Sequence, residues 1–175
     1  MREIAITAVG ADRPGIVAAI TGALLDVGGN LEDARAALLR GSFAIMLVVA
    51  VPDDVTEESV RNALEPVARE LGLGLWTGPA DPAENRAEGE QCVISVYGAD
   101  RPGIVNAFSA LLSDRGANII DLSSRLVGDP PLYVLGIAAT LPDRMDPEAL
   151  RVELAKLAEG TGVECSLSLD ADEII

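Results

Sequence analysis

The sequence Gly-Ala-Asp-Arg-Pro-Gly-Ile-Val occurs twice in this chain, at residues 10–17 and again at residues 98–105. Each copy directly follows an apolar run with the pattern of a strand. A repeat of eight residues at this spacing indicates that one structural unit has been duplicated. Because the chain has 175 residues, the duplication predicts two units of roughly 85 residues each.

The same order of elements can be written for both halves: strand, helix, strand, strand, helix, strand. Apolar residues alternate in the predicted strands and recur at helical spacing in the predicted helices. In the first half the elements are expected at residues 3–9, 12–27, 30–39, 43–51, 56–71 and 73–77. In the second half they are expected at residues 91–97, 102–115, 118–127, 132–140, 146–159 and 163–169.

A β-α-β-β-α-β unit of this size has one favourable arrangement when its crossovers are right-handed. That arrangement is the ferredoxin-like α+β fold, a four-stranded antiparallel sheet with two helices on one face. The other face of each sheet and its edge strands need a neighbour, so we expect the units to pack together or the chain to form a homo-oligomer.

The halves differ in length at one point, a two-residue insertion around 129–131 at the tip of the second predicted hairpin. The domain boundaries follow from the repeat and from a short, polar, proline-containing stretch between the halves. We expect a first domain at 1–78, a linker at 79–89, a second domain at 90–170 and an acidic and apolar tail at 171–175.

The net charge is −15, and acidic residues outnumber basic ones in both halves. Without a basic surface to neutralise phosphates, direct binding to DNA, RNA or an anionic membrane is disfavoured. A role in gene control would therefore act through another protein. The longest apolar run, Phe43–Val51, is too short to cross a bilayer, and no signal peptide precedes the first strand, which predicts a cytoplasmic protein.

Histidine is absent, which excludes catalytic triads with a histidine base and metal sites built from imidazole. Cys92 and Cys165 lie in strand patterns without the spacing of metal ligands or a redox pair, so both are expected to be buried thiols. We therefore expect no metal and no cofactor.

The repeated loop joins the first strand to the first helix and is the best candidate for a site. Gly10 and Gly15 allow close backbone approach, Asp12 is expected to cap the helix, and Pro14 is expected in its first turn. Good turn chemistry alone is one sufficient explanation of this motif. The functional alternative is that N–H groups at the helix start bind a small carboxylate.

An amino acid also carries an ammonium group. Asn30 and Asn118, just after the first helix of each half, can offer a side-chain oxygen to the ammonium and an N–H to the carboxylate, or can simply be turn residues. Asp12 and Asp100 are further candidates for the ammonium. Arg13 and Arg101 can clamp a carboxylate, although arginine before a helix-starting proline more often points to solvent.

A β-α-β-β-α-β unit with Asp-Arg-Pro-Gly-Ile-Val after its first strand and asparagine at the start of its second resembles an ACT domain. Each half of the chain shows this resemblance, so together the two halves cover essentially the whole chain. A tandem pair without an enzyme domain is most similar to the glycine cleavage system transcriptional repressor family. ACT domains usually bind an amino acid between two domains, and the resemblance to the repressor family implies glycine as the amino acid that is sensed. It also implies action on a protein partner such as a DNA-binding regulator or an enzyme. The sequence itself leaves the amino acid open. The residues that it implies for the ligand are Gly10, Ala11, Asp12, Arg13, Pro14, Gly15, Ile16 and Asn30, with Gly98, Ala99, Asp100, Arg101, Pro102, Gly103, Ile104 and Asn118.

Three hypotheses follow. The first is a tandem ACT sensor whose ligand stabilises one arrangement over another. The second is an assembly scaffold whose loops bind nothing. The third is an enzyme, which we do not expect, because no nucleophile, metal set or cofactor loop accompanies the candidate carboxylates.

Overall fold

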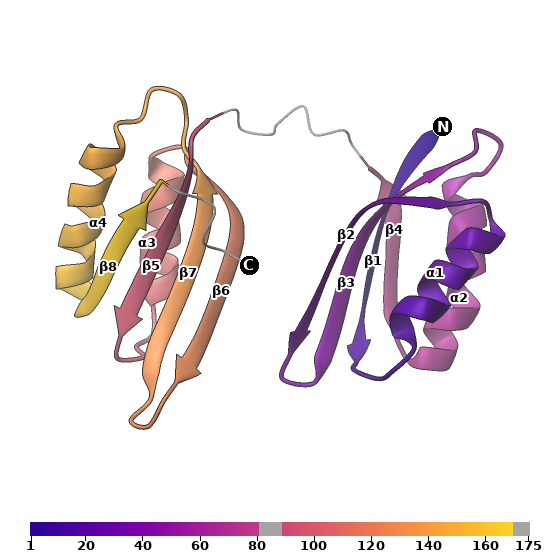
Figure 1. The fold of residues 1–175 in the computed structure, drawn as a ribbon, viewed down its shortest axis with the longest axis horizontal. Coiled ribbons are helices and arrows are strands. Elements are labelled where there is room, and N and C mark those ends of the chain that lie inside the picture. The colour runs from indigo at the N-terminus through magenta and orange to yellow at the C-terminus, as the bar shows by residue number, and fades with distance from the viewer. Residues whose placement is uncertain (81–88, 170–175) are drawn as a thin grey trace. The chain divides into compact units, whose positions relative to one another are not determined.

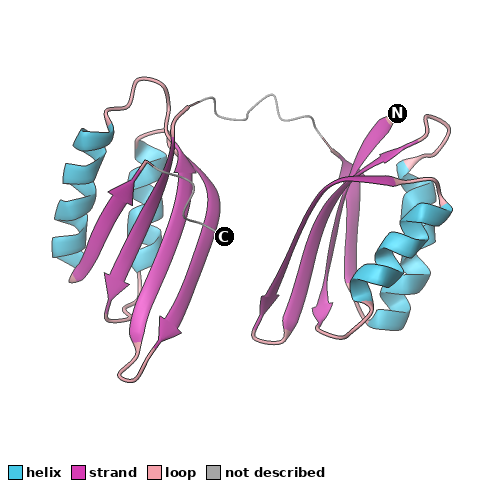
Figure 2. Cartoon of the chain, viewed as in Figure 1, coloured by secondary structure: helices cyan, strands magenta, loops and turns pink. Residues whose placement is uncertain are grey.

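The computed structural model describes residues 1–80 and 89–169, and the chain folds as two compact units, one on either side of residues 81–88 (Figure 1). We call them unit 1 and unit 2. Each is a four-stranded antiparallel sheet with two helices on one face (Figure 2). The predicted ferredoxin-like fold is confirmed in both halves. Most of the predicted linker, 81–88, and the predicted tail, 171–175, lie outside the described residues.

Unit 1 has the strand order β2-β3-β1-β4, so β2 and β4 are its edge strands. Its elements are β1 (Arg2–Ala11), α1 (Ile16–Asp26), β2 (Asn30–Leu39), β3 (Ser42–Val51), α2 (Glu57–Leu71) and β4 (Gly74–Pro79). The last strand extends to Pro79, which is paired with Ile4, and therefore runs two residues past the end expected from the sequence.

The core of unit 1 lies between the sheet and the two helices. Ile4, Ile6 and Ala8 alternate inward along β1, and Ile16, Ile20 and Leu24 form the buried stripe of α1. From α2, Val60, Leu64 and Ala68 complete the cluster. The period of two in the strand and of three to four in the helices brings all these side chains to one layer.

Unit 2 repeats this architecture with the strand order β6-β7-β5-β8. Its elements are β5 (Gln91–Gly98), α3 (Ile104–Asp114), β6 (Asn118–Val127), β7 (Leu132–Thr140), α4 (Pro147–Thr161) and β8 (Val163–Ser168). Phe108 on α3 is the largest fully buried side chain and occupies the place that Ile20 has in unit 1.

The second helix of each unit begins and ends at well-defined caps. The Thr56 side chain accepts a hydrogen bond from the Ser59 N–H at 3.1 Å, and Asp146 accepts one from the Glu148 N–H at 3.0 Å. Gly72 and Gly162 end these helices in the left-handed conformation, with φ of 67° and 70°. The sequence placed both starts within one residue.

Both hairpins contain a β-bulge at the same place. In unit 1 the pairing of β2 with β3 shifts between Leu31 and Asp33, and in unit 2 that of β6 with β7 shifts between Ile119 and Asp121. The predicted insertion in unit 2 is found at the hairpin tip, between β6 and β7, where extra residues disturb no pairing.

The two cysteines differ in burial. Cys92 is buried on β5, as expected, but Cys165 on β8 is only half-buried, which corrects the expectation of two buried thiols. Its place on an edge strand explains the difference, since one flank has no neighbouring strand. In the described parts of the chain, no helix is long and apolar enough to span a membrane.

Candidate functional site

The second glycine of the repeated loop has the same backbone conformation in both units. In unit 1 β1 ends at Ala11, and the Asp12 N–H donates a hydrogen bond to the Gly41 carbonyl at 2.9 Å, which ties the loop to the β2–β3 turn. Gly15 is the residue before the helix, with φ of 94°, and Gly103 in unit 2 has φ of 96°. This left-handed conformation is costly for other residues, which accounts for the second glycine of the motif.

The expected capping by Asp12 is wrong. The N-cap of α1 is Gly15, and no side chain caps it by a hydrogen bond; Gly103 starts α3 in the same way. Pro14 and Pro102 therefore precede the N-cap and do not belong to the first turn. A left-handed glycine turns the chain so sharply that the helix begins at Ile16, four residues after Asp12.

The helix starts consequently leave their first N–H groups without a side-chain partner. The first hydrogen bond of helix α1 is donated by the Ala19 N–H to the carbonyl of the N-cap residue Gly15, at 2.9 Å. In α3 the Ala107 N–H donates to the Gly103 carbonyl in the same way. The N–H groups of the three residues before this donor have no acceptor within the helix. Neither helix has an acidic residue in its first turn. Such an end suits a small anion, because its amides and helix dipole both favour negative charge.

The first glycine of the motif has a different role. A Cβ atom on Gly10 would lie 2.6 Å from Leu73 Cδ2 and 2.9 Å from the Gly72 carbonyl oxygen. On Gly98 it would lie 2.8 Å from Val163 Cγ1. These glycines allow the chain that enters the last strand to pass close to the end of the first strand, which the fold requires.

The remaining loop residues fall into two groups. Ala11, Asp12 and Arg13 are exposed, as are Ala99 and Asp100. Ile16 and Ile104 have side chains buried in the cores, so only their backbone amides are available to a ligand. Arg101 Nη1 donates to the Thr161 carbonyl at 3.4 Å, which places its guanidinium at the C-terminal end of α4.

The two asparagines are not close to the loops of their own units. Asn30 is paired with Ala50, which is paired with Glu3 at the start of β1, whereas the loop follows the far end of β1 (Figure 1). The separation is about the length of β1 from Glu3 to Gly10, roughly 23 Å. Asn118 has the equivalent place in unit 2. A site made from the loop and the asparagine of one unit is therefore not formed. The Asn30 side chain instead donates to Glu32 at 2.8 Å.

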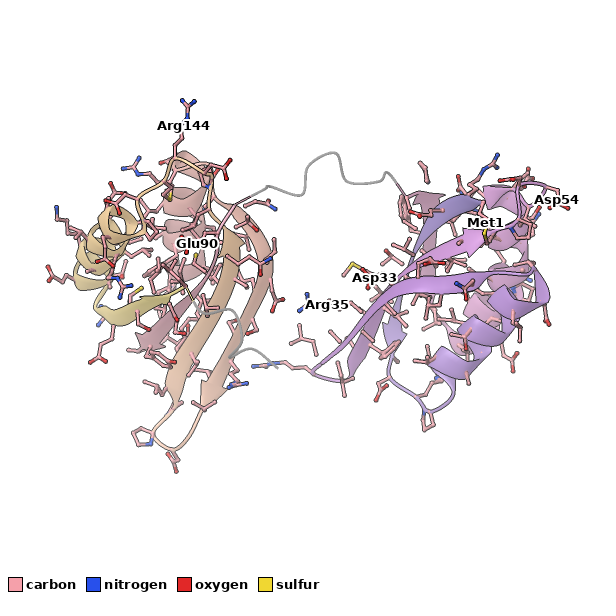
Figure 3. The ribbon with its side chains drawn as sticks, turned by 45° about the horizontal axis from the view of Figure 1, so that its top comes forward. Met1, Asp33, Arg35, Asp54, Glu90 and Arg144 are labelled. Atoms are coloured by element: carbon pink, nitrogen blue, oxygen red, sulfur yellow. The ribbon has the colours of Figure 1, made fainter. Side chains whose placement is uncertain are left out.

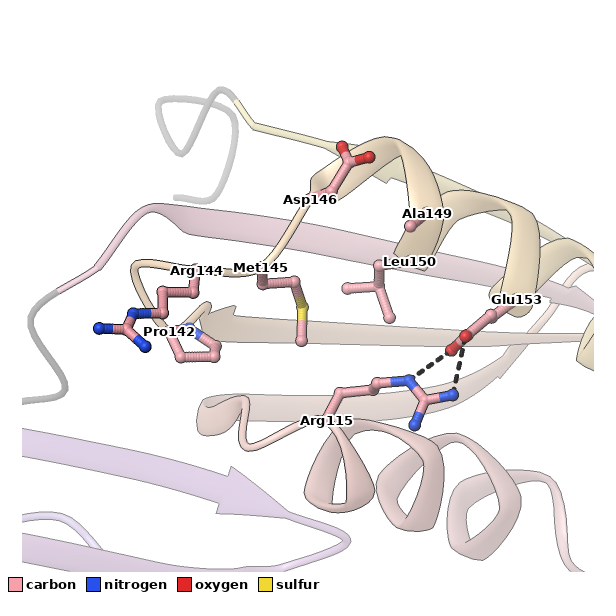
Figure 4. Close-up of a pocket in the computed structure, with 8 residues that line it drawn as sticks. All are labelled: Arg115, Pro142, Arg144, Met145, Asp146, Ala149, Leu150 and Glu153. Carbon is pink, nitrogen blue, oxygen red and sulfur yellow. Dashed lines mark hydrogen bonds and ion pairs between the residues drawn. The ribbon is translucent and has the colours of Figure 1, made fainter.

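One cavity was not anticipated from the sequence. It lies in unit 2, has a volume of about 340 Å³, and is bounded by the end of α3, the β7–α4 connection and the start of α4 (Figure 4). Arg115 forms two hydrogen bonds of 2.7 Å with Glu153 along one side, while Met145 and Leu150 supply apolar surface. Arg144 extends away from this ion pair.

The ion pair affects the titration of both partners. The hydrogen bonds from Arg115 hold the pKa of Glu153 below its ordinary value, and Glu153 raises the pKa of Arg115. Unit 1 has Val27 and Ala63 at the corresponding positions. In the sequence, this replacement of two apolar residues by a charged pair is a signal that could have indicated the cavity.

Residues 1–80 and 89–169 contain no group of three or more cysteine, aspartate or glutamate side chains placed to hold a metal ion. The thiols have raised pKa values because of burial, that of Cys165 reaching about 11.

Comparison with known proteins agrees with the fold. The family model described as ACT domain matches residues 2–76 and 90–168, and the chain belongs to this family. It is 38% identical over 76 residues to a UPF0237 protein of Methanopyrus kandleri, covering 43% of this chain and 84% of that protein. It is also homologous to the glycine cleavage system transcriptional repressor of Escherichia coli, with 33% identity over 123 residues, 70% of this chain and 64% of the repressor.

Among solved structures, a protein of unknown function from Galdieria sulphuraria has a TM-score of 0.84 and 27% identity, with 97% of this chain and 99% of that chain covered. The crystal structure of a putative glycine cleavage system transcriptional repressor has a TM-score of 0.67 and 21% identity, with 95% and 96% covered, which shows the same fold. The chain is thus a tandem ACT-domain protein related to these repressors.

Proposed function

We propose that this protein is an amino-acid-binding regulator and that each repeated loop holds the carboxylate of a small amino acid at the start of α1 or α3. The observation that carries the proposal is the pair of identical loops whose left-handed glycines leave the helix N-termini without a side-chain cap. A zwitterion brings a carboxylate to this point, where amides and helix dipole favour negative charge. The relationship to the repressors supports a regulatory role.

The chain acts through a protein partner. Its net charge of −15 disfavours direct contact with DNA, so a regulator of this kind changes the activity of a DNA-binding regulator or an enzyme. The ligand must bind two states of the protein with different affinity, because equal affinity shifts no population. Glycine is the first ligand to test, since the related repressor is named for the glycine cleavage system.

Asn30 and Asn118 have a restricted role in this proposal. Because each lies roughly 23 Å from the loop of its own unit, it can contact only a ligand that is held by another ACT unit. If each unit binds its ligand without help from another unit, Asn30→Ala should leave ligand binding by the loop at Gly10–Ile16 unchanged.

A thermal-shift screen against the twenty amino acids tests the proposal. A ligand at one hundred times its Kd stabilises the native state by about 2.7 kcal/mol, which is readily seen as a higher Tm. In the Ala18→Pro variant one first-turn amide is lost while proline remains tolerated at that turn. Ala18→Ser keeps the amide and is the matched control, and Asn106→Pro repeats the test in unit 2.

The expected result is a selective shift that Ala18→Pro and Asn106→Pro reduce and Ala18→Ser retains. A flat response of the wild type at millimolar amino acid would contradict the proposal. The assembly scaffold, in which the loops are only good turns, would then be the better account.

A further inference from the structure

The cavity of unit 2 lies on the side of the sheet that carries the helices. It is bounded by the end of α3, the β7–α4 connection and the start of α4 (Figure 4). Helix α3 starts at Ile104 in the repeated loop and ends at Asp114, and its length is about 16 Å. The cavity is therefore at the opposite end of α3 from the loop that we propose to hold an amino acid.

Four residues that line this cavity differ in kind from their counterparts in unit 1. The replacements, from unit 1 to unit 2, are Val27 to Arg115, Asp54 to Arg144, Val55 to Met145 and Ala63 to Glu153. Unit 1 forms the same fold without these residues, so the fold does not require them. The chain has 13 basic residues beside 28 acidic ones, and the cavity has gained two of the 13.

The hydrogen-bonding capacity that remains at the cavity belongs to donors. Glu153 accepts two hydrogen bonds of 2.7 Å from Arg115, and Asp146 accepts one from the Glu148 N–H as the cap of α4. Arg144 has no ion pair with any other residue of 1–80 or 89–169. It projects outward from the β7–α4 connection (Figure 3). A guanidinium with unused N–H groups binds a carboxylate by two parallel hydrogen bonds.

The inner surface of the cavity suits an aromatic ring. Met145 and Leu150 supply apolar surface, and Ala149 adds a methyl group. The sulfur of methionine makes favourable contacts with ring edges. Glu153 holds the Arg115 guanidinium in one orientation, and a fixed planar cation of this kind packs well against the face of a ring.

The volume of the cavity limits the size of the ligand. A water molecule takes about 30 Å³ in the liquid, so a volume of about 340 Å³ has room for roughly ten waters. A compound of about eleven heavy atoms fills a similar space. The volume is at the lower end of the range for ligand pockets, about 300–1,000 Å³. A ligand so small is expected to bind with a Kd of about 0.1–5 mM.

We propose that this cavity binds a small aromatic carboxylic acid. The ring packs against Met145, Leu150 and the Arg115 guanidinium, and Arg144 holds the carboxylate. The net charge of −15 does not prevent this, because salt at physiological concentration screens charges more than about 8 Å away. Unit 1 has Asp54 in the place of Arg144, which repels a carboxylate. The protein thus has a second ligand site whose atoms are different from those of the repeated loops.

The experiment is a titration of the nitrogen-15-labelled full chain with 3-phenylpropanoate, followed by amide NMR spectra. This probe has about eleven heavy atoms and joins a phenyl ring to a carboxylate. We expect the amide signals of Arg115 and of residues 142–153 to move, with a Kd of about 0.1–5 mM. The signals of Val27 and of residues 52–63 in unit 1 should stay in place. The uncharged 3-phenylpropanamide, which has the same shape, should bind at least about fivefold more weakly.

Two sets of variants test the charged groups. Arg144→Ala should raise the Kd of 3-phenylpropanoate at least about fivefold. Arg151→Ala is the matched control, because this arginine is also on the surface of unit 2 but does not line the cavity, and the Kd should stay about the same. The double variant Arg115→Val with Glu153→Ala restores the residues that unit 1 has, so it should fold, and it should also bind at least about fivefold more weakly.

A cavity-filling variant separates binding inside the cavity from attraction by surface charge. Ala149 is exposed at the start of α4, so Ala149→Phe should fold, keep both arginines and abolish binding of the probe. Ala18→Pro, which removes an amide of the first repeated loop, should bind the probe like the wild type, so the two kinds of site are tested separately. A wild type without shifts at about 10 mM probe, an amide that binds as tightly as the acid, or an unchanged Kd in Arg144→Ala or Ala149→Phe would each overturn the proposal.

Discussion

The two units agree in their loops and differ on the uncovered faces of their sheets. The octapeptide is identical, its glycines have the same conformation, and the cores use equivalent positions. On the uncovered face, unit 1 presents Met46 and Trp76, whereas unit 2 has Gly136 and Ser166 at these places.

The small residues of unit 2 leave a hollow of about 410 Å³, bordered by Asp121, Arg125 and Tyr97. The loop and the core are needed to form the fold and therefore match in both copies. The uncovered face is not needed for the fold, and it is there that the copies have acquired different surfaces.

The largest expected effect is a loss of stability in the core of unit 2 that leaves the core of unit 1 unchanged. Phe108→Ala removes the biggest buried side chain of unit 2 and should lower its free energy of unfolding by about 3–5 kcal/mol. Both tyrosines and both cysteines belong to unit 2, while the single tryptophan belongs to unit 1. Circular dichroism should therefore show an early transition that Trp76 fluorescence does not follow. An equal shift of both signals would show that the units unfold as one.

The next largest effect compares the first glycine of the motif in the two units, by the loss of stability when it is replaced. Gly10→Ala forces a Cβ atom to within 3 Å of Gly72 and Leu73, just before β4, and Gly98→Ala forces one to within 3 Å of Val163 at the start of β8. Each should cost about 1–3 kcal/mol in denaturant titrations. Gly22→Ala is the control, because nothing lies within 4 Å of its added Cβ atom and α1 should gain from the better helix former. A neutral Gly10→Ala would contradict the close crossing.

A smaller effect concerns the ion pair that only unit 2 has. The pKa of Glu153 is lowered in the folded state by its hydrogen bonds with Arg115. The pair therefore stabilises unit 2 above the pKa that this carboxyl has in the unfolded chain, and the gain is lost as the pH falls through the lowered folded value. Glu153→Gln should thus reduce stability at pH 7 and have less effect at pH 3. Urea titrations at both pH values, with Trp76 as the unchanged reference for unit 1, measure the difference.

The smallest effect leaves stability untouched. Burial raises the pKa of Cys165 to about 11, so at pH 8 roughly one thiol in a thousand is a thiolate. Reaction with a disulfide reagent should be slow and should accelerate about tenfold per pH unit. The same reagent should react faster with Phe108→Ala, because opening of unit 2 exposes both thiols. Rapid stoichiometric labelling of the wild type at pH 8 would contradict this expectation.

The fold was predictable because its signals are local and occur twice. Alternation in the strands, helical spacing from Ile16 to Leu24 and the caps at Thr56 and Asp146 each specify a short segment. The helix start was misplaced because Asp12 is a typical capping residue, and nothing local shows that Gly15 takes the left-handed conformation.

The separation of Asn30 from its loop could have been inferred from the order of the elements. A helix that follows a strand returns the chain to the starting end of that strand, so the next strand begins there. The grouping of Arg35, Met46 and Trp76 on one face of the unit 1 sheet could not have been inferred, because it depends on the pairing of four strands and on a bulge that changes which residues share a face.

The bulge in β2 also determines where the chain tolerates a change of length. Glu32 is the extra residue there and Ile120 is its counterpart in unit 2, and neither is paired with β3 or β7. Deleting either one leaves every other side chain of its strand on its present face. Deleting any neighbour within the paired strand moves the side chains along the rest of it to the opposite face of the sheet. Each unit therefore contains one position at which loss of a codon keeps both the pairing and the faces of this edge strand.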